Sequence, residues 1–104
     1  MDIYWTITGG ADPIDLFKKH KGRYKMIHAK DMSQSMRFEG DGGDSSQWIK
    51  LFPYMTSCGE GVFDLPGIIA TAKENGVDHF FVEQDLVQSP EIALKKSADY
   101  LKSL

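Results

Sequence analysis

The sequence predicts an α/β domain in which helices cover a parallel sheet. Three apolar segments have strand-like composition, at residues 1–8, 24–29 and 77–83. They are apolar through their lengths rather than alternating, which is typical of parallel strands that are covered by helices. Helix-start signals follow the three segments, so the predicted order is β-α-β-loop-α-β-α with right-handed crossovers.

The first segment is predicted to be a strand because it is rich in aromatic and β-branched residues, and Gly9-Gly10 ends it. Residues 30–61 are predicted to be irregular, with a brief helical or extended piece at residues 48–52. A loop this long inside a compact domain either serves a function or indicates an error in the assignment.

The three helices are predicted from their start and stop signals. Each begins with a capping side chain and a proline, at Asp12-Pro13, Asp64 with Pro66, and Ser89-Pro90. Gly22 ends the first helix and Asn75-Gly76 ends the second. Apolar residues at helical spacing predict the buried stripes, which are Ile68, Ile69 and Ala72 in the second helix and Leu94, Ala98 and Leu101, with Ala93, Ser97 and Leu104, in the third.

Composition excludes several classes of protein. The 104 residues are 41% hydrophobic and 26% charged, which fits one small globular domain. A net charge of −3 does not favour a nucleic-acid partner, and the basic run Lys18-Lys19-His20-Lys21 fits the end of a helix. No segment approaches the ~20 apolar residues of a membrane span, and the N-terminus lacks the features of a signal peptide, so we expect a cytoplasmic protein.

The chain has a single cysteine, so it can form no intramolecular disulfide, which is compatible with a reducing compartment. We expect Cys58 to be a small buried or loop residue, because the sequence identifies no base that would activate it as a nucleophile.

Polar side chains occur near the ends of the predicted strands. His28 lies near the end of the second strand, Glu83 near the end of the third, and Asp2 in the first. Parallel α/β sheets place their sites at the carboxyl ends of the strands. An imidazole with two carboxylates suits Mn, Zn, Co or Mg, and such a metal can polarise a carbonyl or bind a pair of hydroxyls. The alternative is that His28 is a structural residue with its hydrogen bonds satisfied.

Four phrases occur in order along almost the whole chain. They are Asp2-Ile-Tyr-Trp with Gly10-Ala-Asp-Pro13, Gly22-Arg23 with His28-Ala-Lys-Asp31, Gly59-Glu-Gly61 with Asp64, and Val82-Glu-Gln-Asp85. As an ordered set they resemble the C-terminal part of the sugar phosphate isomerase/epimerase family, whose members are xylose-isomerase-like TIM barrels. The resemblance implies that residues 1–104 are a partial domain, the last three β/α units of a (β/α)8 barrel with an incomplete parallel sheet.

The resemblance also implies roles for individual residues. Asp2, His28 and Glu83 would bind a divalent metal, and Glu83 would also act as a catalytic acid/base. Lys30 would contact a substrate oxygen, and Asp31 would orient His28. For Lys30 and Asp31 a surface salt link is an equal alternative.

Two further residues are expected near the mouth of the barrel. Glu60 would line this mouth, although its flanking glycines are explained by a tight turn alone. Trp5 would form an apolar wall against a sugar ring, and the alternative is that it packs in the core.

The implied activity is metal-dependent isomerisation or epimerisation of a sugar or sugar phosphate through an enediolate. A keto-inositol dehydratase or related lyase is the alternative enzyme, because that branch shares the His-x-Lys-Asp phrase. An apurinic endonuclease is related by fold, but the acidic balance argues against DNA.

The resemblance is incomplete, because the family's first-half metal-binding Glu and acid/base Glu have no counterpart here. We therefore expect the C-terminal portion of a longer enzyme, inactive by itself, or else a non-catalytic α/β fragment. Its open sheet edges and uncovered apolar face predict association into a homo-oligomer.

Overall fold

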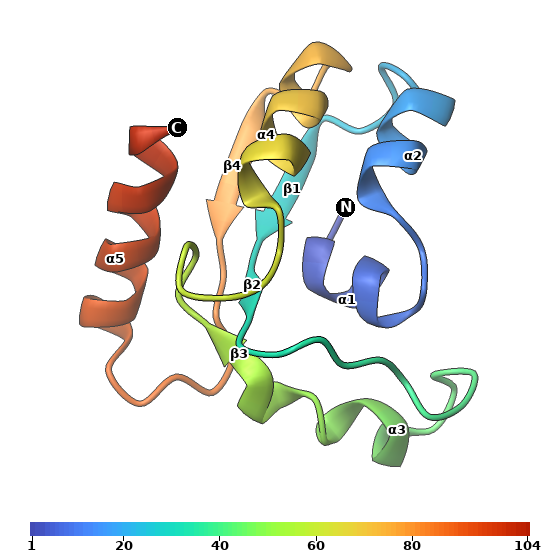
Figure 1. Cartoon of the computed structure of the whole chain (residues 1–104), viewed down its shortest axis with the longest axis vertical. Helices are drawn as coiled ribbons and strands as arrows, with labels where there is room; N and C mark the ends of the chain where they lie inside the picture. The colour runs from blue at the N-terminus through green and yellow to red at the C-terminus, as the bar shows by residue number, and fades with distance from the viewer.

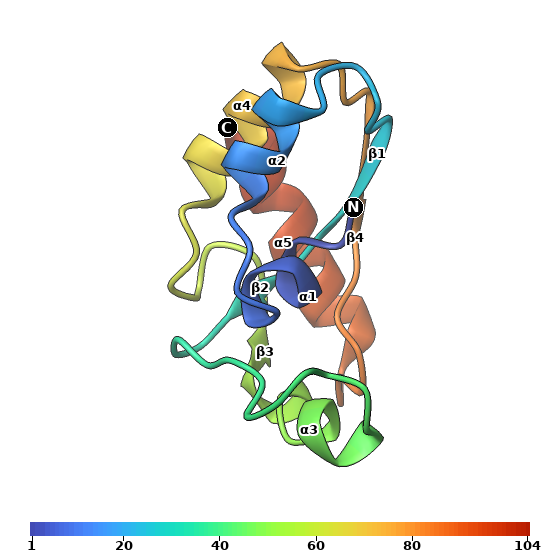
Figure 2. The same cartoon turned by 90° about the vertical axis from the view of Figure 1, so that its right-hand side faces the viewer.

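The computed structural model describes residues 1–104 and contains a short parallel sheet with helices on one face (Figure 1). The sheet consists of β1 (Met26–Ala29) and β4 (His79–Val82), which pair in parallel. Figure 2 shows α2 and α4 to one side of these strands. The other elements are α1 (Ile3–Thr8), α2 (Pro13–Lys19), β2 (Asp31–Met32), α3 (Ser45–Ile49), the 3-10 helix η1 (Phe52–Tyr54), β3 (Met55–Thr56), α4 (Leu65–Glu74) and α5 (Pro90–Ser103).

The predicted α/β class is confirmed, but the first predicted strand is wrong, because Ile3–Thr8 form helix α1. The Asp2 carboxylate caps this helix by accepting a hydrogen bond from the Trp5 N–H at 3.0 Å. This cap favours a helix despite the strand-like composition of the segment. Only the first residues extend the sheet, because the Met1 carbonyl accepts the His28 N–H at 2.9 Å and Asp2 forms a parallel bridge with His28.

The other two strands and the three predicted helices are present. Asp12 caps α2 by accepting the Ile14 N–H at 2.8 Å, and Asp64 caps α4 by accepting the Gly67 N–H at 3.1 Å. Helix α5 begins at Pro90 as predicted, but the side chain of Ser89 makes no capping hydrogen bond. None of the helices combines the length and the apolar character needed to span a membrane.

The region predicted to be irregular is partly ordered. Strands β2 and β3 form a two-residue antiparallel pair, and η1 leads into β3. Four residues from α1 and this region form a second, smaller core: Tyr4, Met32, Leu51 and Met55. The Tyr4 hydroxyl donates a hydrogen bond to the Leu51 carbonyl, and burial raises the pKa of Tyr4 above its ordinary value. The hydroxyl therefore stays neutral and able to donate.

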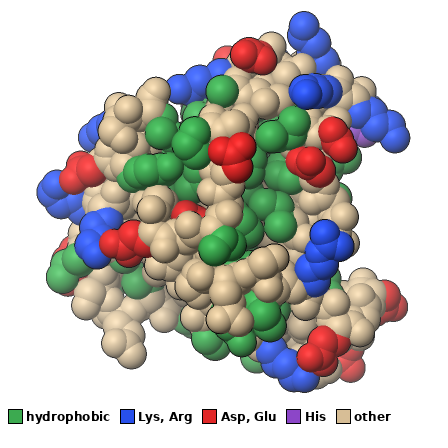
Figure 3. Space-filling model, in the orientation of Figure 1, with side chains coloured by type: hydrophobic (Ala, Val, Ile, Leu, Met, Phe, Trp, Pro, Cys, Tyr) green, Lys and Arg blue, Asp and Glu red, His purple; other side chains and the backbone are tan.

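The main core lies between the sheet and the helices. Ile27 and Ala29 of β1 share it with the stripe predicted for α4, Ile68, Ile69 and Ala72. Helix α5 buries Ala93 and Ser97 and partly buries Ala98 and Leu101, as predicted, but Leu94 and Leu104 are exposed, so the predicted stripe is wrong for these two leucines. Apolar side chains remain visible between the helices on the covered face (Figure 3).

The opposite face of the sheet has no helix over it. Residues directly opposite each other in a parallel pair share a face, so Met26, His28, His79 and Phe81 all lie on this side. Met26 is 51% exposed and Phe81 is 50% exposed. This face therefore presents large apolar side chains next to the polar ends of the strands.

Replacing Phe81 with serine is expected to weaken association between copies of the chain. Exposed apolar side chains on a sheet face favour self-association, and Phe81 is the largest one on this face. Light scattering at micromolar concentration should show oligomers for the wild type and a smaller mean mass for Phe81→Ser. Leu86→Ser is the matched control, because Leu86 is 83% exposed but lies outside the sheet, and it should leave the mass unchanged. A monodisperse wild-type monomer would contradict the expectation.

Candidate metal centre

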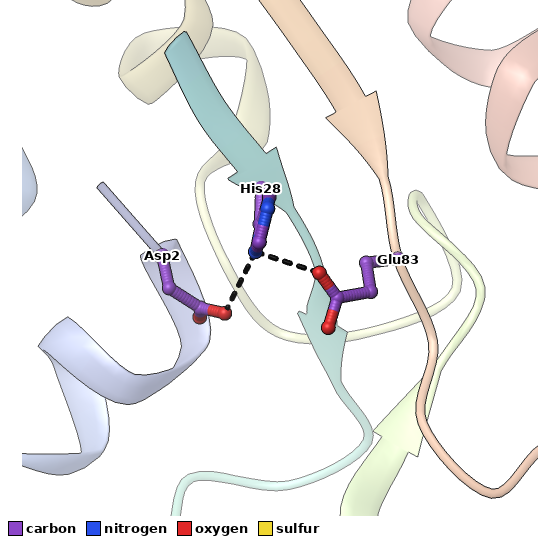
Figure 4. Close-up of side chains that lie close together, drawn as sticks. All are labelled: Asp2, His28 and Glu83. Atoms are coloured by element: carbon purple, nitrogen blue, oxygen red, sulfur yellow. Dashed lines mark hydrogen bonds and ion pairs between the residues drawn. The ribbon is translucent and has the colours of Figure 1, made fainter.

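The side chains of Asp2, His28 and Glu83 converge where the parallel segments end (Figure 4). The Nδ1 atom of His28 lies 2.6 Å from Glu83 Oε2 and 3.4 Å from Asp2 Oδ2. One possible ligand atom from each residue lies within 4.8 Å of the other two. The structure thus brings together the three residues that were predicted as metal ligands.

Strand pairing explains this convergence. Asp2 bridges to His28 on one side of β1, and Phe81 lies opposite His28 on the other side. Side chains two residues apart along a strand share a face, so Glu83 follows Phe81 on the uncovered side. The Glu83 N–H donates to the Ala29 carbonyl at 3.2 Å, which continues the pairing up to this residue. The backbone register alone therefore places the imidazole between the two carboxylates.

Lys30 places a buried ammonium group under these carboxylates. Its side chain is 2% exposed, and Nζ lies 2.8 Å from Asp85 Oδ2, 3.0 Å from Asp2 Oδ2 and 3.0 Å from Glu83 Oε1. Burial acts to lower the pKa of Lys30, but the hydrogen bonds to Asp85, Asp2 and Glu83 outweigh it and raise the pKa above its ordinary value. Lys30 lies beside the candidate ligands. Its ammonium group pairs with three carboxylates, whereas the prediction was that it contacts a substrate oxygen.

Asp31 does not orient His28, so that prediction is wrong. Its buried carboxylate accepts four backbone N–H groups, from Met32 at 2.8 Å, Gly59 at 2.9 Å, Gly61 at 3.0 Å and Phe63 at 3.2 Å. Three of these donors belong to the loop before α4. Asp31 therefore fixes this loop against β2, and the imidazole of His28 is held by Asp2 and Glu83 instead.

A cavity of about 570 Å³ lies beside the three candidate ligands. Its polar lining consists of Asp2, His28, Lys30, Glu83 and Asp85. Its aromatic lining consists of Trp5, Phe38, Trp48 and Phe52. This volume falls in the range of small-molecule sites. We refer to this space as the aromatic cavity.

Of the two residues that were predicted at the mouth of the site, only one lines the cavity. Trp5 lines the aromatic cavity, as the prediction of an apolar wall requires. Glu60 does not line it, and its carboxylate instead pairs with Lys96 of α5 at 2.8 Å. The prediction for Glu60 is therefore wrong, because its loop also lies against α5, where the Cys58 N–H donates a hydrogen bond to the Ser97 hydroxyl at 2.9 Å.

Sequence reasoning missed Asp85 and three of the aromatic residues. Asp85 follows Glu83 by two positions, and this spacing is a signal that both could face the same side of the sheet. Trp48 and Phe52 are four residues apart, and their rings are 5.9 Å apart in the structure. Phe38 carries no local signal, because its loop reaches the cavity only through tertiary contacts.

The donor set fits a divalent metal. One imidazole nitrogen and two carboxylate oxygens suit Mn, Co, Zn or Mg. Three protein ligands leave coordination positions open, as catalytic sites do. The carboxylates of Asp2, Glu83 and Asp85 outnumber the ammonium of Lys30 by two, so a divalent cation would balance the cluster.

Cys58 is expected to react slowly with iodoacetamide in the folded protein. Burial raises the pKa of its thiol from 9.0 to about 11, so the thiolate is scarce at pH 8. Because the pKa of the thiol is raised in the folded state, the buried neutral thiol contributes to the free energy of unfolding below pH 9. This contribution is lost as the pH rises towards 11. Mass spectrometry should show rapid alkylation only after urea is added. Equal rates for folded and unfolded protein would contradict the buried position of Cys58.

Comparisons with known proteins identify a solved structure with a similar fold. The chain matches no protein-family model and no curated protein. A similar solved structure is the sugar phosphate isomerase/epimerase from Parabacteroides distasonis ATCC 8503, with 26% sequence identity and a TM-score of 0.66. The match covers the whole of this chain and 30% of that chain. In fold, the chain is therefore similar to a part of an isomerase/epimerase.

Proposed function

We propose that this chain forms part of a metal-dependent isomerase or epimerase that acts on a sugar or sugar phosphate. The observation that carries the proposal is the convergence of Asp2, His28 and Glu83, whose ligand atoms lie within 4.8 Å of one another. The likeness to a sugar phosphate isomerase/epimerase supports the class of reaction. In this proposal the β/α segments are the last three units of a (β/α)8 barrel, and the site lies at the carboxyl ends of its strands.

Asp2, His28 and Glu83 would hold the metal through their carboxylates and imidazole, which already face one another. A bound divalent cation supplies electrostatic stabilisation for the negative charge that develops on neighbouring oxygens of an enediolate. Lys30 holds Asp2 Oδ2 and Glu83 Oε1, and so fixes the direction of both carboxylates. The protein thereby pre-arranges its ligands before any ion binds.

Glu83 is the acid/base candidate of this chain. Isomerisation through an enediolate requires a group that removes a proton from the carbon beside a carbonyl and returns a proton to a neighbouring atom. The Glu83 carboxylate lines the aromatic cavity and lies on the uncovered face of the sheet. It can therefore reach a ligand in the cavity.

A structural ion-pair network is the second candidate role of the cluster. The observation that favours it is that His28 and Lys30 already pair with the carboxylates of Asp2, Glu83 and Asp85. In that case the chain is a non-catalytic α/β fragment, and the five side chains only stabilise the ends of the strands.

Calorimetric titration with Mn²⁺ separates the two candidates. We expect the wild type to bind one ion and His28→Ala to bind it at least about a hundredfold more weakly. Loss of a residue that only hydrogen-bonds to a metal ligand lowers metal affinity by about 10–100-fold, and loss of a ligand itself should lower it more. His79→Ala is the matched control, since His79 lies on the same face but outside the cluster. Equal affinities for the wild type and His28→Ala would remove His28 from the site and leave the structural role.

A further inference from the structure

The aromatic cavity has one continuous apolar wall. Trp5 lies at its centre, stacked on Phe38 at a centroid distance of 6.0 Å and meeting Phe52 edge-on at 5.4 Å. Trp48 contacts both Trp5 and Phe52, at 6.3 Å and 5.9 Å. A wall of this kind offers flat apolar surface to the C–H face of a ring-shaped ligand, and the carboxylates beside it can accept hydrogen bonds from hydroxyl groups.

The cavity offers no free cation. Lys30 is the only lysine or arginine in its lining, and an ammonium group has three N–H donors. Three carboxylate oxygens lie within 3.0 Å of the Lys30 Nζ atom, so each donor already has an acceptor. Lys50 pairs with Glu39 at 3.4 Å, and Arg37 borders a different cavity beside Asp12.

The charge of the cavity therefore disfavours an anionic ligand. Its carboxylates outnumber its ammonium by two, and one divalent cation brings the total only to neutrality. A phosphate dianion would lose its hydration here without gaining the charge-assisted hydrogen bonds that phosphate sites provide. Neutral hydroxyl groups meet no such penalty, because they can donate hydrogen bonds to the carboxylates.

We propose that the aromatic cavity selects an unphosphorylated sugar or polyol over its phosphate ester. The proposal rests on the proposed function for the reaction itself and names the class of ligand. The apolar face of the ligand lies on the wall around Trp5, and its hydroxyl groups point towards the carboxylates and the metal position. Selection comes from the lining that this chain contributes, in which Lys30 is fully engaged and no other lysine or arginine is present.

Intrinsic fluorescence tests this selection directly, because the chain has two tryptophans and both line the cavity. The Mn²⁺-loaded protein is titrated with D-fructose, D-xylulose and D-ribulose, and then with the terminal phosphate ester of each. At least one free sugar is expected to change the fluorescence with an affinity at least about tenfold higher than that of its ester. Tighter or equal binding of the esters would overturn the proposal, and so would the absence of any response to all three sugars.

A charge introduced into the wall provides a second test. Phe38→Lys places a cation in the lining while it keeps both tryptophans, so it should raise the affinity for the phosphate esters. Val62→Lys is the matched control, because it adds the same charge at an exposed position outside the cavity and should change neither affinity. An increase of the same size in both variants would mean that net charge, and not the cavity, determines selection.

The failure of this proposal is distinct from the failure of the proposed function. If Mn²⁺ binds through His28 but the esters bind as well as the free sugars, the metal site stands and the ligand class is wrong. If His28→Ala binds Mn²⁺ as tightly as the wild type, the metal site fails whatever the sugars do.

Discussion

Asp31→Asn is expected to lower the free energy of unfolding by about 2–4 kcal/mol, the largest loss among single isosteric changes in this chain. The buried carboxylate accepts four backbone N–H groups, three of which come from the loop before α4. An asparagine has one acceptor oxygen and turns an NH₂ group towards donors. Buried N–H groups then lose their partner, and the new donor faces other donors.

Urea unfolding followed by circular dichroism measures this loss. Glu60→Gln is the control, because it changes a carboxylate of the same loop that is exposed and pairs only with Lys96. We expect the control to stay within about 0.5 kcal/mol of the wild type. An Asp31→Asn protein as stable as the wild type would mean that the loop is not held by this carboxylate.

Gly61 adds an independent check on the same contact. A Cβ atom at this position would overlap the Asp31 carboxylate and the Met32 carbonyl. Gly61→Ala should therefore also destabilise the fold, and the effects of Gly61→Ala and Asp31→Asn should not add, because both changes break the same interaction.

The second large effect is expected for Lys30→Met. This change removes the ammonium that three carboxylates share and leaves Asp2, Glu83 and Asp85 facing one another without a cation. Loss of one partner from a buried ion pair costs about 3–5 kcal/mol, and partial exposure of the carboxylates reduces this to about 2–3 kcal/mol. Methionine keeps most of the volume of the lysine stem, so the loss measures charge rather than packing.

Divalent metal should restore part of the stability of Lys30→Met. An ion that binds only the folded state stabilises it by about 2.7 kcal/mol at a hundred times its dissociation constant. Thermal unfolding with and without Mn²⁺ should show a gain for Lys30→Met at least as large as for the wild type. Lys50→Met is the control, because Lys50 and its partner Glu39 are both exposed. No response of Lys30→Met to Mn²⁺ would contradict a metal site beside this lysine.

The meeting of His28 and Glu83 could be predicted from the sequence because both lie near the carboxyl ends of predicted strands, whereas Asp2 was predicted as a ligand from the family resemblance. The carboxyl ends of parallel strands meet at one edge, so polar residues there come together wherever the loops run. The strand predicted at residues 1–8 was wrong because strand propensity and helix capping compete within a segment of eight residues. Asp2 still reached the site, since its own backbone pairs with His28 before the helix begins.

The residues that were wrongly predicted or missed take their positions from contacts with distant parts of the sequence. Three of the four partners of Asp31 lie 28 to 32 residues away in the loop before α4, and no local pattern indicates that pairing. Phe38 reaches Trp5 from a region without regular structure. The aromatic cavity is therefore a product of tertiary folding, whereas the metal centre follows from strand register.

X-ray absorption of the Co²⁺-loaded protein tests the central claim most directly, because it reports the atoms bound to the ion. The metal centre predicts one imidazole nitrogen together with carboxylate oxygens, and the imidazole signal should vanish in His28→Ala but persist in His79→Ala. A wild-type spectrum with oxygen ligands only would contradict the assignment of His28, and so would an imidazole signal that survives His28→Ala.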